Sequence, residues 1–182
     1  MTSLLPKLLF RPFTIVDLAQ VMTWRYEPPY DVYNFSPHAV VENEWPYFED
    51  EKNGRFYTIT TPTNELIGFC TFFADATVDG GDYSEEALDI GLGIRPDLTG
   101  LGKGVGLGVI TAVLAFAATT FQPTAFRVTI AAFNQRAQRV WQKAGFQPRQ
   151  RFCRTGDDMA FIILTRQNAE VQKTDDGRPT AA

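Results

Sequence analysis

Residues 94–108 read IRPDLTGLGKGVGLG, and this stretch decides the fold. Every second residue from 100 to 108 is glycine, and the apolar residues that follow over residues 105–120 recur with helical spacing. A glycine inside a helix costs about 0.5–1 kcal/mol relative to alanine, so some benefit must offset these glycines. Bare N–H groups at a helix N-terminus bind phosphate oxygens when no side chains intervene. The stretch therefore predicts a strand end, a phosphate-binding loop and a helix.

Two well-known phosphate-loop patterns do not fit this stretch. The dinucleotide pattern G-x-G-x-x-G fails, because Val105 and Leu107 stand where its third glycine belongs. The pattern G-x-x-x-x-G-K-[ST] also fails, because Asp97 replaces its first glycine and Gly104 replaces its final Ser or Thr. Close packing of a helix on a sheet also needs small residues, and this explanation of the glycines stays open.

The rest of the chain alternates strand and helix signals. Apolar runs predict strands at residues 7–12, 56–61, 66–73, 87–94, 125–131, 146–152 and 158–165, and helical spacing or capping signals predict helices at residues 14–25, 40–51, 105–120 and 135–144. We therefore expect one α/β (α+β) domain over residues 1–166, with a mixed, mostly antiparallel sheet of about seven strands flanked by helices. Residues 167–182 are polar and predict a tail too poor in apolar residues to fold.

Composition narrows the possible partners. The 182 residues are 45% hydrophobic and carry a net charge of −4, without a block of lysines and arginines, which argues against a nucleic-acid or membrane partner. Without a signal peptide or a long apolar span, we expect a cytoplasmic protein. Cys70 and Cys153 stand alone in apolar surroundings and predict free, buried thiols. His38 is the only histidine, so we expect neither a metal site nor a Ser-His-Asp triad.

Two segments resemble the fingerprints of one enzyme superfamily. They are TGLGKG at residues 99–104 and NQRAQRVWQKAGF at residues 134–146, about 30 residues further on. In this order they resemble the GNAT superfamily of acetyl-CoA-dependent N-acetyltransferases, nearest the ribosomal-protein-alanine acetyltransferase-like subgroup, over residues 8–165. The resemblance implies the GNAT acyl-CoA N-acyltransferase fold, with a sheet split near Ile94 where acetyl-CoA enters. It also implies transfer of the acetyl group to a primary amine.

The same resemblance assigns the two binding regions. The main-chain amides of the glycine loop would bind the pyrophosphate of CoA, the end of the preceding strand would pair with the pantetheine arm, and the first residue of the second fingerprint would contact the cofactor. These residues are Leu101, Gly102, Lys103, Gly104 and Val105, then Leu92, Gly93 and Ile94, and finally Asn134. The acceptor pocket would come from the aromatic segment after the first helix, with Trp24, Tyr30, Asp31 and Tyr33 as its contacts, although aromatic residues there equally serve as core.

Asp89 is the candidate general base. Alternation along the strand over residues 87–94 places Asp89, Gly91 and Gly93 on one face, so a carboxylate lies beside two residues without side chains. We interpret this face as a floor left clear for the acetyl group and the amine, with Asp89 accepting a proton directly or through water. A solvated carboxylate at a strand end is the alternative, and Glu85 and Glu86 are reserve bases.

The general acid is missing from the position where the resemblance places it. Similar proteins often carry Tyr where this chain has Trp141, and an indole does not release its proton to a thiolate. The sequence therefore predicts an N-acetyltransferase acting by direct attack in a ternary complex, as a monomer or homodimer. A non-catalytic acyl-CoA-binding sensor and a binder of another phosphorylated metabolite remain the alternatives, and the amine acceptor stays open.

Overall fold

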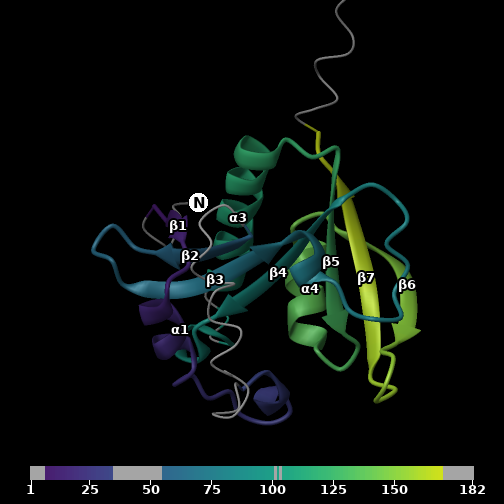
Figure 1. Cartoon of the computed structure of the whole chain (residues 1–182), viewed down its shortest axis with the longest axis horizontal. Coiled ribbons are helices and arrows are strands. Elements are labelled where there is room, and N and C mark those ends of the chain that lie inside the picture. The colour runs from purple at the N-terminus through teal and green to yellow at the C-terminus, as the bar shows by residue number, and fades with distance from the viewer. Residues whose placement is uncertain (1–6, 35–54, 101, 103, 170–182) are drawn as a thin grey trace, which may run out of the picture.

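A seven-stranded mixed sheet carries the fold, with the strands in the order β1-β2-β3-β4-β5-β7-β6 (Figure 1). The computed structural model describes residues 7–34, 55–100, 102 and 104–169. The strands are β1 (Leu9–Pro12), β2 (Phe56–Thr60), β3 (Leu66–Phe72), β4 (Leu88–Ile94), β5 (Ala125–Ala131), β6 (Gln147–Cys153) and β7 (Ala160–Gln167). All neighbours pair antiparallel except β4 and β5, which run parallel. The predicted fold class is confirmed, and the predicted helix at residues 40–51 lies outside the described residues.

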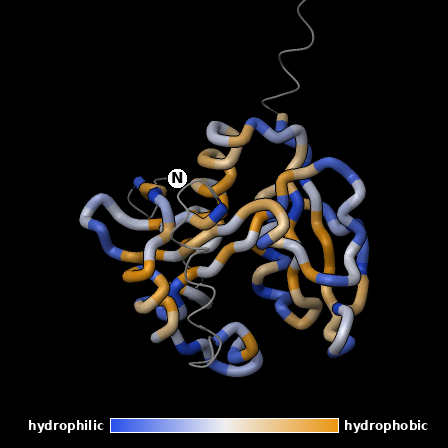
Figure 2. Tube along the Cα trace, in the orientation of Figure 1, coloured by the Kyte–Doolittle hydropathy of each residue, from blue (hydrophilic) through white to orange (hydrophobic). Residues whose placement is uncertain are grey.

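Three helices flank the sheet. They are α1 (Ile15–Val21), α3 (Val105–Phe121) and α4 (Gln135–Lys143). The main core packs α3 and α4 against the central strands, and a second cluster packs α1 against β3 through Leu18, Leu66 and Phe69. Figure 2 shows hydrophobic residues along α3 and the central strands, with hydrophilic residues in the peripheral loops. The sheet therefore has α3 and α4 on one side and α1 against the β1–β3 part.

Two element ends differ from their predicted positions. Helix α1 ends at Val21 rather than near Arg25, because the amides of Thr23 and Trp24 bond to carbonyls three residues back and tighten the last turn. At the other end of the chain, β7 continues to Gln167. The buried Asn168 then bonds to the Pro123 carbonyl, so the folded part extends past the predicted boundary at residue 166.

The strands β4 and β5 stay together over only two positions. Leu88 pairs with Phe126 and Asp89 pairs with Arg127, after which the two strands separate. The opening therefore starts at residue 90, earlier than the predicted split near Ile94. On its other edge β4 stays paired with β3 as far as the amide of Arg95, which donates to the Ile67 carbonyl. The gap thus lies inside the sheet rather than at its edge.

A capping box fixes the start of α1. The carboxylate of Asp17 accepts hydrogen bonds from the backbone amide and hydroxyl of Thr14, from Thr58 of β2 and from both terminal nitrogens of Arg11. Burial by itself would raise the pKa of Asp17, but the hydrogen bonds from Arg11, Thr14 and Thr58 outweigh it and lower the pKa to about 2. This network holds α1, and the segment that follows it, against the sheet.

We expect Asp17→Asn to lower the free energy of unfolding by roughly 2 kcal/mol at pH 7. The pKa of Asp17 is depressed in the folded protein, so its contribution is present above the ordinary carboxylate pKa and disappears as the pH falls from about 4 towards 2. Urea unfolding of both proteins between pH 2 and 7 measures this, and the two curves should converge at the acid end. Asp79→Asn, at an exposed side chain, is the control. A difference in the free energy of unfolding that persists at pH 2 would contradict the prediction.

Candidate active site

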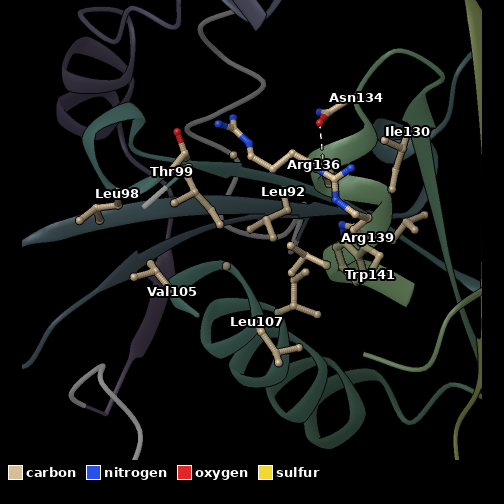
Figure 3. Close-up of a pocket in the computed structure, with 18 of the residues that line it drawn as sticks. Leu92, Leu98, Thr99, Val105, Leu107, Ile130, Asn134, Arg136, Arg139 and Trp141 are labelled. Atoms are coloured by element: carbon tan, nitrogen blue, oxygen red, sulfur yellow. Dashed lines mark hydrogen bonds between the residues drawn. The ribbon is translucent and has the colours of Figure 1, made fainter. Parts of the chain in front are cut away.

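A cleft of about 700 Å³ occupies the gap between β4 and β5. It is lined by residues 90–94 of β4, residues 128–130 of β5, the glycine loop with the first turns of α3, and one side of α4. Figure 3 shows Leu92, Leu107 and Arg139 from three of these elements around the same space. A cleft of this size accommodates a cofactor-sized ligand, and its position between diverging parallel strands agrees with the predicted entry of acetyl-CoA.

The glycine loop is open towards this cleft. Gly100, Gly102 and Gly104 have φ angles of 76°, 66° and 74°, in the left-handed region that side chains disfavour. Apart from its chain neighbours, a Cβ atom at Gly102 or Gly104 would meet no atom of the described residues within 4 Å, so packing against them does not explain these two glycines. Both line the cleft immediately before α3 begins at Val105. Leu101 and Lys103 lie outside the described residues.

One face of α4 is cationic. Arg136, Arg139 and Lys143 follow the i, i+3, i+7 spacing that places side chains on the same side of a helix, and all three line the cleft. A methyl group at Gly100 would lie only 3.1 Å from Nη1 of Arg136, so this guanidinium rests against the glycine loop. No Asp or Glu lines the cleft among the described residues. In a chain of net charge −4, this arrangement favours a polyanionic ligand.

A second face of α4 turns towards the sheet. Asn134 caps the helix, because its side-chain oxygen accepts from the amide of Ala137, as the dashed line in Figure 3 marks. Trp141 lies two turns further on, is 5% exposed and packs edge-on against Phe146 at 4.8 Å between ring centroids. Helical side chains lean towards the N-terminus, so the indole leans over the turn that precedes Trp141. Both residues line the cleft.

The edge of β4 that faces the cleft is not paired with β5 beyond Asp89. Because Arg95 donates its amide to β3, alternation along an antiparallel strand points the amides and carbonyls of Leu92 and Ile94 away from β3, into the cleft. The Ile94 carbonyl accepts a 2.8 Å hydrogen bond from the hydroxyl of Tyr26. This edge is a template on which an extended ligand with amide groups pairs as another strand would.

The segment of residues 26–34 spans the two sides of the cleft. The side-chain amide of Asn34 closes it by accepting from the Tyr26 amide and donating to the Tyr26 carbonyl. Tyr33 stacks on Phe133, beyond the end of β5, at 6.0 Å between centroids and accepts a 3.3 Å hydrogen bond from Asn134. Tyr26 therefore contacts the β4 side and Tyr33 the β5 side. We call residues 26–34 the bridging segment.

The predicted acceptor residues divide into two groups. Trp24 and Tyr33 line the cleft, together with Phe69, whose ring lies 6.1 Å from the indole of Trp24. Tyr30 and Asp31 are not among the lining residues. Tyr30 lies under the guanidinium of Arg136 at 4.2 Å, and Asp31 is exposed on the short 3-10 turn η1 (Tyr30–Tyr33). The structure thus brings half of the predicted acceptor set to the cleft.

The predicted cofactor residues gather at the cleft wherever they are described. Its lining includes Leu92, Gly93, Ile94, Gly102, Gly104, Val105 and Asn134. Sequence reasoning missed the cationic face formed by Arg136, Arg139 and Lys143, although its helical spacing is legible in the second fingerprint. It also missed Thr129 and Phe69, which lie inside apolar strands and carry no pattern that singles them out.

Asp89 does not lie where the prediction placed it. Its two oxygens accept 2.6 and 2.8 Å hydrogen bonds from Nε and Nη2 of Arg127, it is 6% exposed, and it is absent from the cleft lining. Arg127 also donates to the Glu85 carbonyl and lies over the ring of Tyr83 at 4.8 Å. A buried carboxylate that accepts both hydrogen bonds from one guanidinium is poorly placed to take a proton from an amine. The geometry weighs against a base and assigns Asp89 to the ion pair.

The predicted clear floor is wrong. The space beside Gly93 is filled by the ring of Phe69, and the space beside Gly91 is filled by the methyl group of Thr71. These glycines let the side chains of β3 lie across β4 and do not leave a bare surface. The alternation was correct, but the neighbouring strand supplies the side chains that β4 lacks.

We expect Asp89→Asn to destabilise the protein by about 3–5 kcal/mol, because it leaves the guanidinium of Arg127 buried without its counter-charge. Denaturant unfolding measures the loss. For the fraction that remains folded, the pH dependence of turnover should match that of the unchanged protein. If Asp89→Asn leaves the stability unchanged but removes the titration of a base from the pH dependence of turnover, Asp89 is the general base after all.

Comparison with known proteins places the chain in a family. Residues 7–147 match the family model described as acetyltransferase (GNAT) domain. The chain belongs to the GNAT acetyltransferase family. This confirms the prediction of an acetyl-CoA-dependent N-acetyltransferase, whereas the ribosomal-protein-alanine subgroup is not confirmed. No curated protein matches the chain in sequence.

Solved structures share the fold. The spermidine N-acetyltransferase of Vibrio cholerae in complex with CoA and spermine superposes with a TM-score of 0.62 at 17% identity, covering 91% of this chain and 98% of the other. An aminoglycoside acetyltransferase, AAC(6')-Ib with coenzyme A and kanamycin, gives 0.68 at 20% identity, covering 92% and 98%. A GNAT-family acetyltransferase of Bacillus anthracis gives 0.62 at 19%, covering 88% and 95%. At these identities the likeness is one of fold.

The structure also describes the two cysteines, the acidic and metal-ligating side chains, and the lengths of the helices. Cys70 is buried, and its burial raises the pKa of the thiol, whereas Cys153 is exposed, so the prediction of two buried thiols is wrong for the second. No group of three or more His, Cys, Asp or Glu side chains converges as a metal site within the described ranges. None of the helices described is long and apolar enough to cross a membrane.

Proposed function

We propose that the protein transfers the acetyl group of acetyl-CoA to a primary amine of a small, positively charged acceptor. The observation that carries this proposal is the charge and shape of the cleft. One end offers bare backbone and three cations, the middle offers the unpaired edge of β4, and the other end is walled by aromatic side chains. Each part fits one part of this pair of substrates.

The cofactor end fits a phosphorylated thioester carrier. The glycine loop leaves its N–H groups uncovered at the start of α3, where the helix dipole favours an anion. Arg136, Arg139 and Lys143 supply positive charge beside it for the pyrophosphate and the 3′-phosphate of CoA. The amides along β4 suit the two amide bonds of the pantetheine arm. An amide of this edge that the pantetheine arm leaves unpaired would donate to the oxyanion that develops at the thioester carbonyl.

The acceptor end fits a cation. Trp24, Tyr26, Tyr33 and Phe69 form its wall, and aromatic faces attract ammonium groups. Two acidic residues of the bridging segment, Glu27 and Asp31, are exposed. Negative charge next to an aromatic wall favours an amine with further positive groups. The spermine and kanamycin bound by two structural neighbours are such amines.

Chemistry in a ternary complex needs only positioning of the two substrates. A neutral amine held against the thioester carbonyl attacks it directly, and the tetrahedral species collapses with loss of the CoA thiolate. Because Asp89 is committed to Arg127, the proton of the amine leaves through water in the cleft. Direct transfer of this kind needs neither a covalent acyl-enzyme nor a metal.

An amine panel tests the function. The protein is incubated with acetyl-CoA and with spermidine, kanamycin, single amino acids or an alanine-headed peptide, and free thiol is recorded. We expect thiol release with the polycations. Release with the peptide alone would favour the second acceptor class, a protein N-terminus, which rests on the subgroup resemblance of the fingerprints. Acetyl-CoA binding without release for any amine would favour the acyl-CoA sensor, and stabilisation by NAD or ATP instead of acetyl-CoA would overturn the proposal.

Gly104→Ala tests the loop. An added Cβ strains the left-handed conformation by about 1–2 kcal/mol and projects into the cleft where the pyrophosphate would lie. We expect the Kd for acetyl-CoA, measured by calorimetry, to rise at least tenfold. The matched control is Gly156→Ala, which has a φ of 108° and equally open surroundings but lies in the turn between β6 and β7. It should lose similar stability and keep its affinity. Equal losses of affinity in both variants would refute the loop's role.

A further inference from the structure

The two tyrosines of the bridging segment differ in what their hydroxyl protons do. Tyr26 Oη lies 2.8 Å from the carbonyl of Ile94, and a carbonyl only accepts, so Tyr26 donates its proton there. That proton is committed to the edge of β4. Tyr26 therefore serves to hold the bridging segment on β4.

The hydroxyl of Tyr33 differs, because it accepts a hydrogen bond from Asn134. Asn134 accepts the amide of Ala137 through its side-chain oxygen, which fixes the orientation of the side-chain amide and directs its nitrogen to Tyr33. The nitrogen of that amide only donates, so Tyr33 Oη is the acceptor in this bond. Its own hydrogen has no hydrogen-bond partner among the described residues, and Tyr33 lines the cleft.

The other donors of the cleft are less suitable. Trp141 holds the α4 position that faces the sheet, and its indole proton is not transferable. The hydroxyl of Thr99 donates to the Pro96 carbonyl, and that of Thr129 bonds to Tyr83. Lys143 belongs to the cationic face of α4, on a different side of the helix from Asn134 and Trp141.

We infer that Tyr33 is the general acid of the reaction and gives its phenolic proton to the leaving thiolate. This inference rests on the proposed function. The amine nitrogen forms its bond to the thioester carbon, the C–S bond breaks with its electron pair on sulfur, and sulfur takes the proton from Tyr33 Oη. The proton lost by the amine passes to water, and water returns one to the phenolate, so the products are an amide and a free thiol.

The surroundings of Tyr33 suit this task. Partial burial of Tyr33, which is 40% exposed, raises the pKa of its phenol and keeps the phenol protonated at neutral pH, while the Asn134 hydrogen bond and the charge of Arg136 act in the opposite direction. The last two stabilise the phenolate that donation leaves behind. The titratable or charged groups near it are Tyr26, Tyr30 and Asp31 on its own segment and Arg136 on α4.

Kinetics of Tyr33→Phe with a reactive amine test the inference. We expect kcat to fall about 100-fold, as for the loss of a general acid, with an unchanged Kd for acetyl-CoA that also reports an intact fold. Tyr57→Phe is the matched control, since Tyr57 lies on β2 outside the cleft lining, and it should keep its kcat. Incorporation of 3-fluorotyrosine at position 33 lowers the phenol pKa alone. It should restore turnover and shift the alkaline limb of kcat to lower pH.

The outcomes separate the two claims. If the unchanged protein releases no thiol with any amine, the proposed function is wrong, and so is the role of Tyr33 as general acid. If the unchanged protein releases thiol and Tyr33→Phe keeps its full kcat, only the role of Tyr33 as general acid is wrong. A large loss of kcat in Tyr26→Phe but not in Tyr33→Phe would also contradict the role of Tyr33 as general acid. The same holds if 3-fluorotyrosine leaves the alkaline limb of kcat unmoved, because a purely structural tyrosine would not move that limb.

Discussion

The buried ion pair of Asp89 and Arg127 stands at the last position where β4 and β5 are paired. Up to this pair the sheet is continuous, and beyond it the two strands diverge around the cleft. A parallel pair that stops after two residues leaves backbone groups unpaired in the middle of a domain, and such groups are costly unless water or a ligand satisfies them. The opening is therefore useful as a binding site, and the ion pair sets where it begins.

The elements around the opening divide the cleft by charge and polarity. Helix α4 presents three cations to the cleft on one face, with Arg136 against the glycine loop, while Asn134 and Trp141 face the sheet on another. The bridging segment closes the opposite side with aromatic rings and attaches to β4 through Tyr26 and to the α4 cap through Tyr33. An anionic carrier and a cationic acceptor would thus enter from different ends, which suits direct transfer between them in one complex.

Most of the fold, and about half of the site, could be predicted from the sequence. Strong local signals gave the strands, the glycine loop and the capping box, because alternation, helical spacing and left-handed glycines are properties of short segments. The wrong predictions concern contacts between segments that lie far apart in the sequence. The neighbours of Gly91 and Gly93 come from β3, and the partner of Asp89 is 38 residues away on β5. Periodicity gives the face of a side chain, but the residue packed against that face comes from strand order and register.

Backbone amide NMR during titration with CoA tests the central claim most directly. If the separated strands and the glycine loop form the carrier site, the largest shifts should fall on residues 90–94 of β4, on Gly102, Gly104 and Val105, and on the first turn of α4. The amides of β6 and of the β6–β7 turn should barely move. Shifts concentrated on those distant strands, or no saturable shifts at all, would contradict the account.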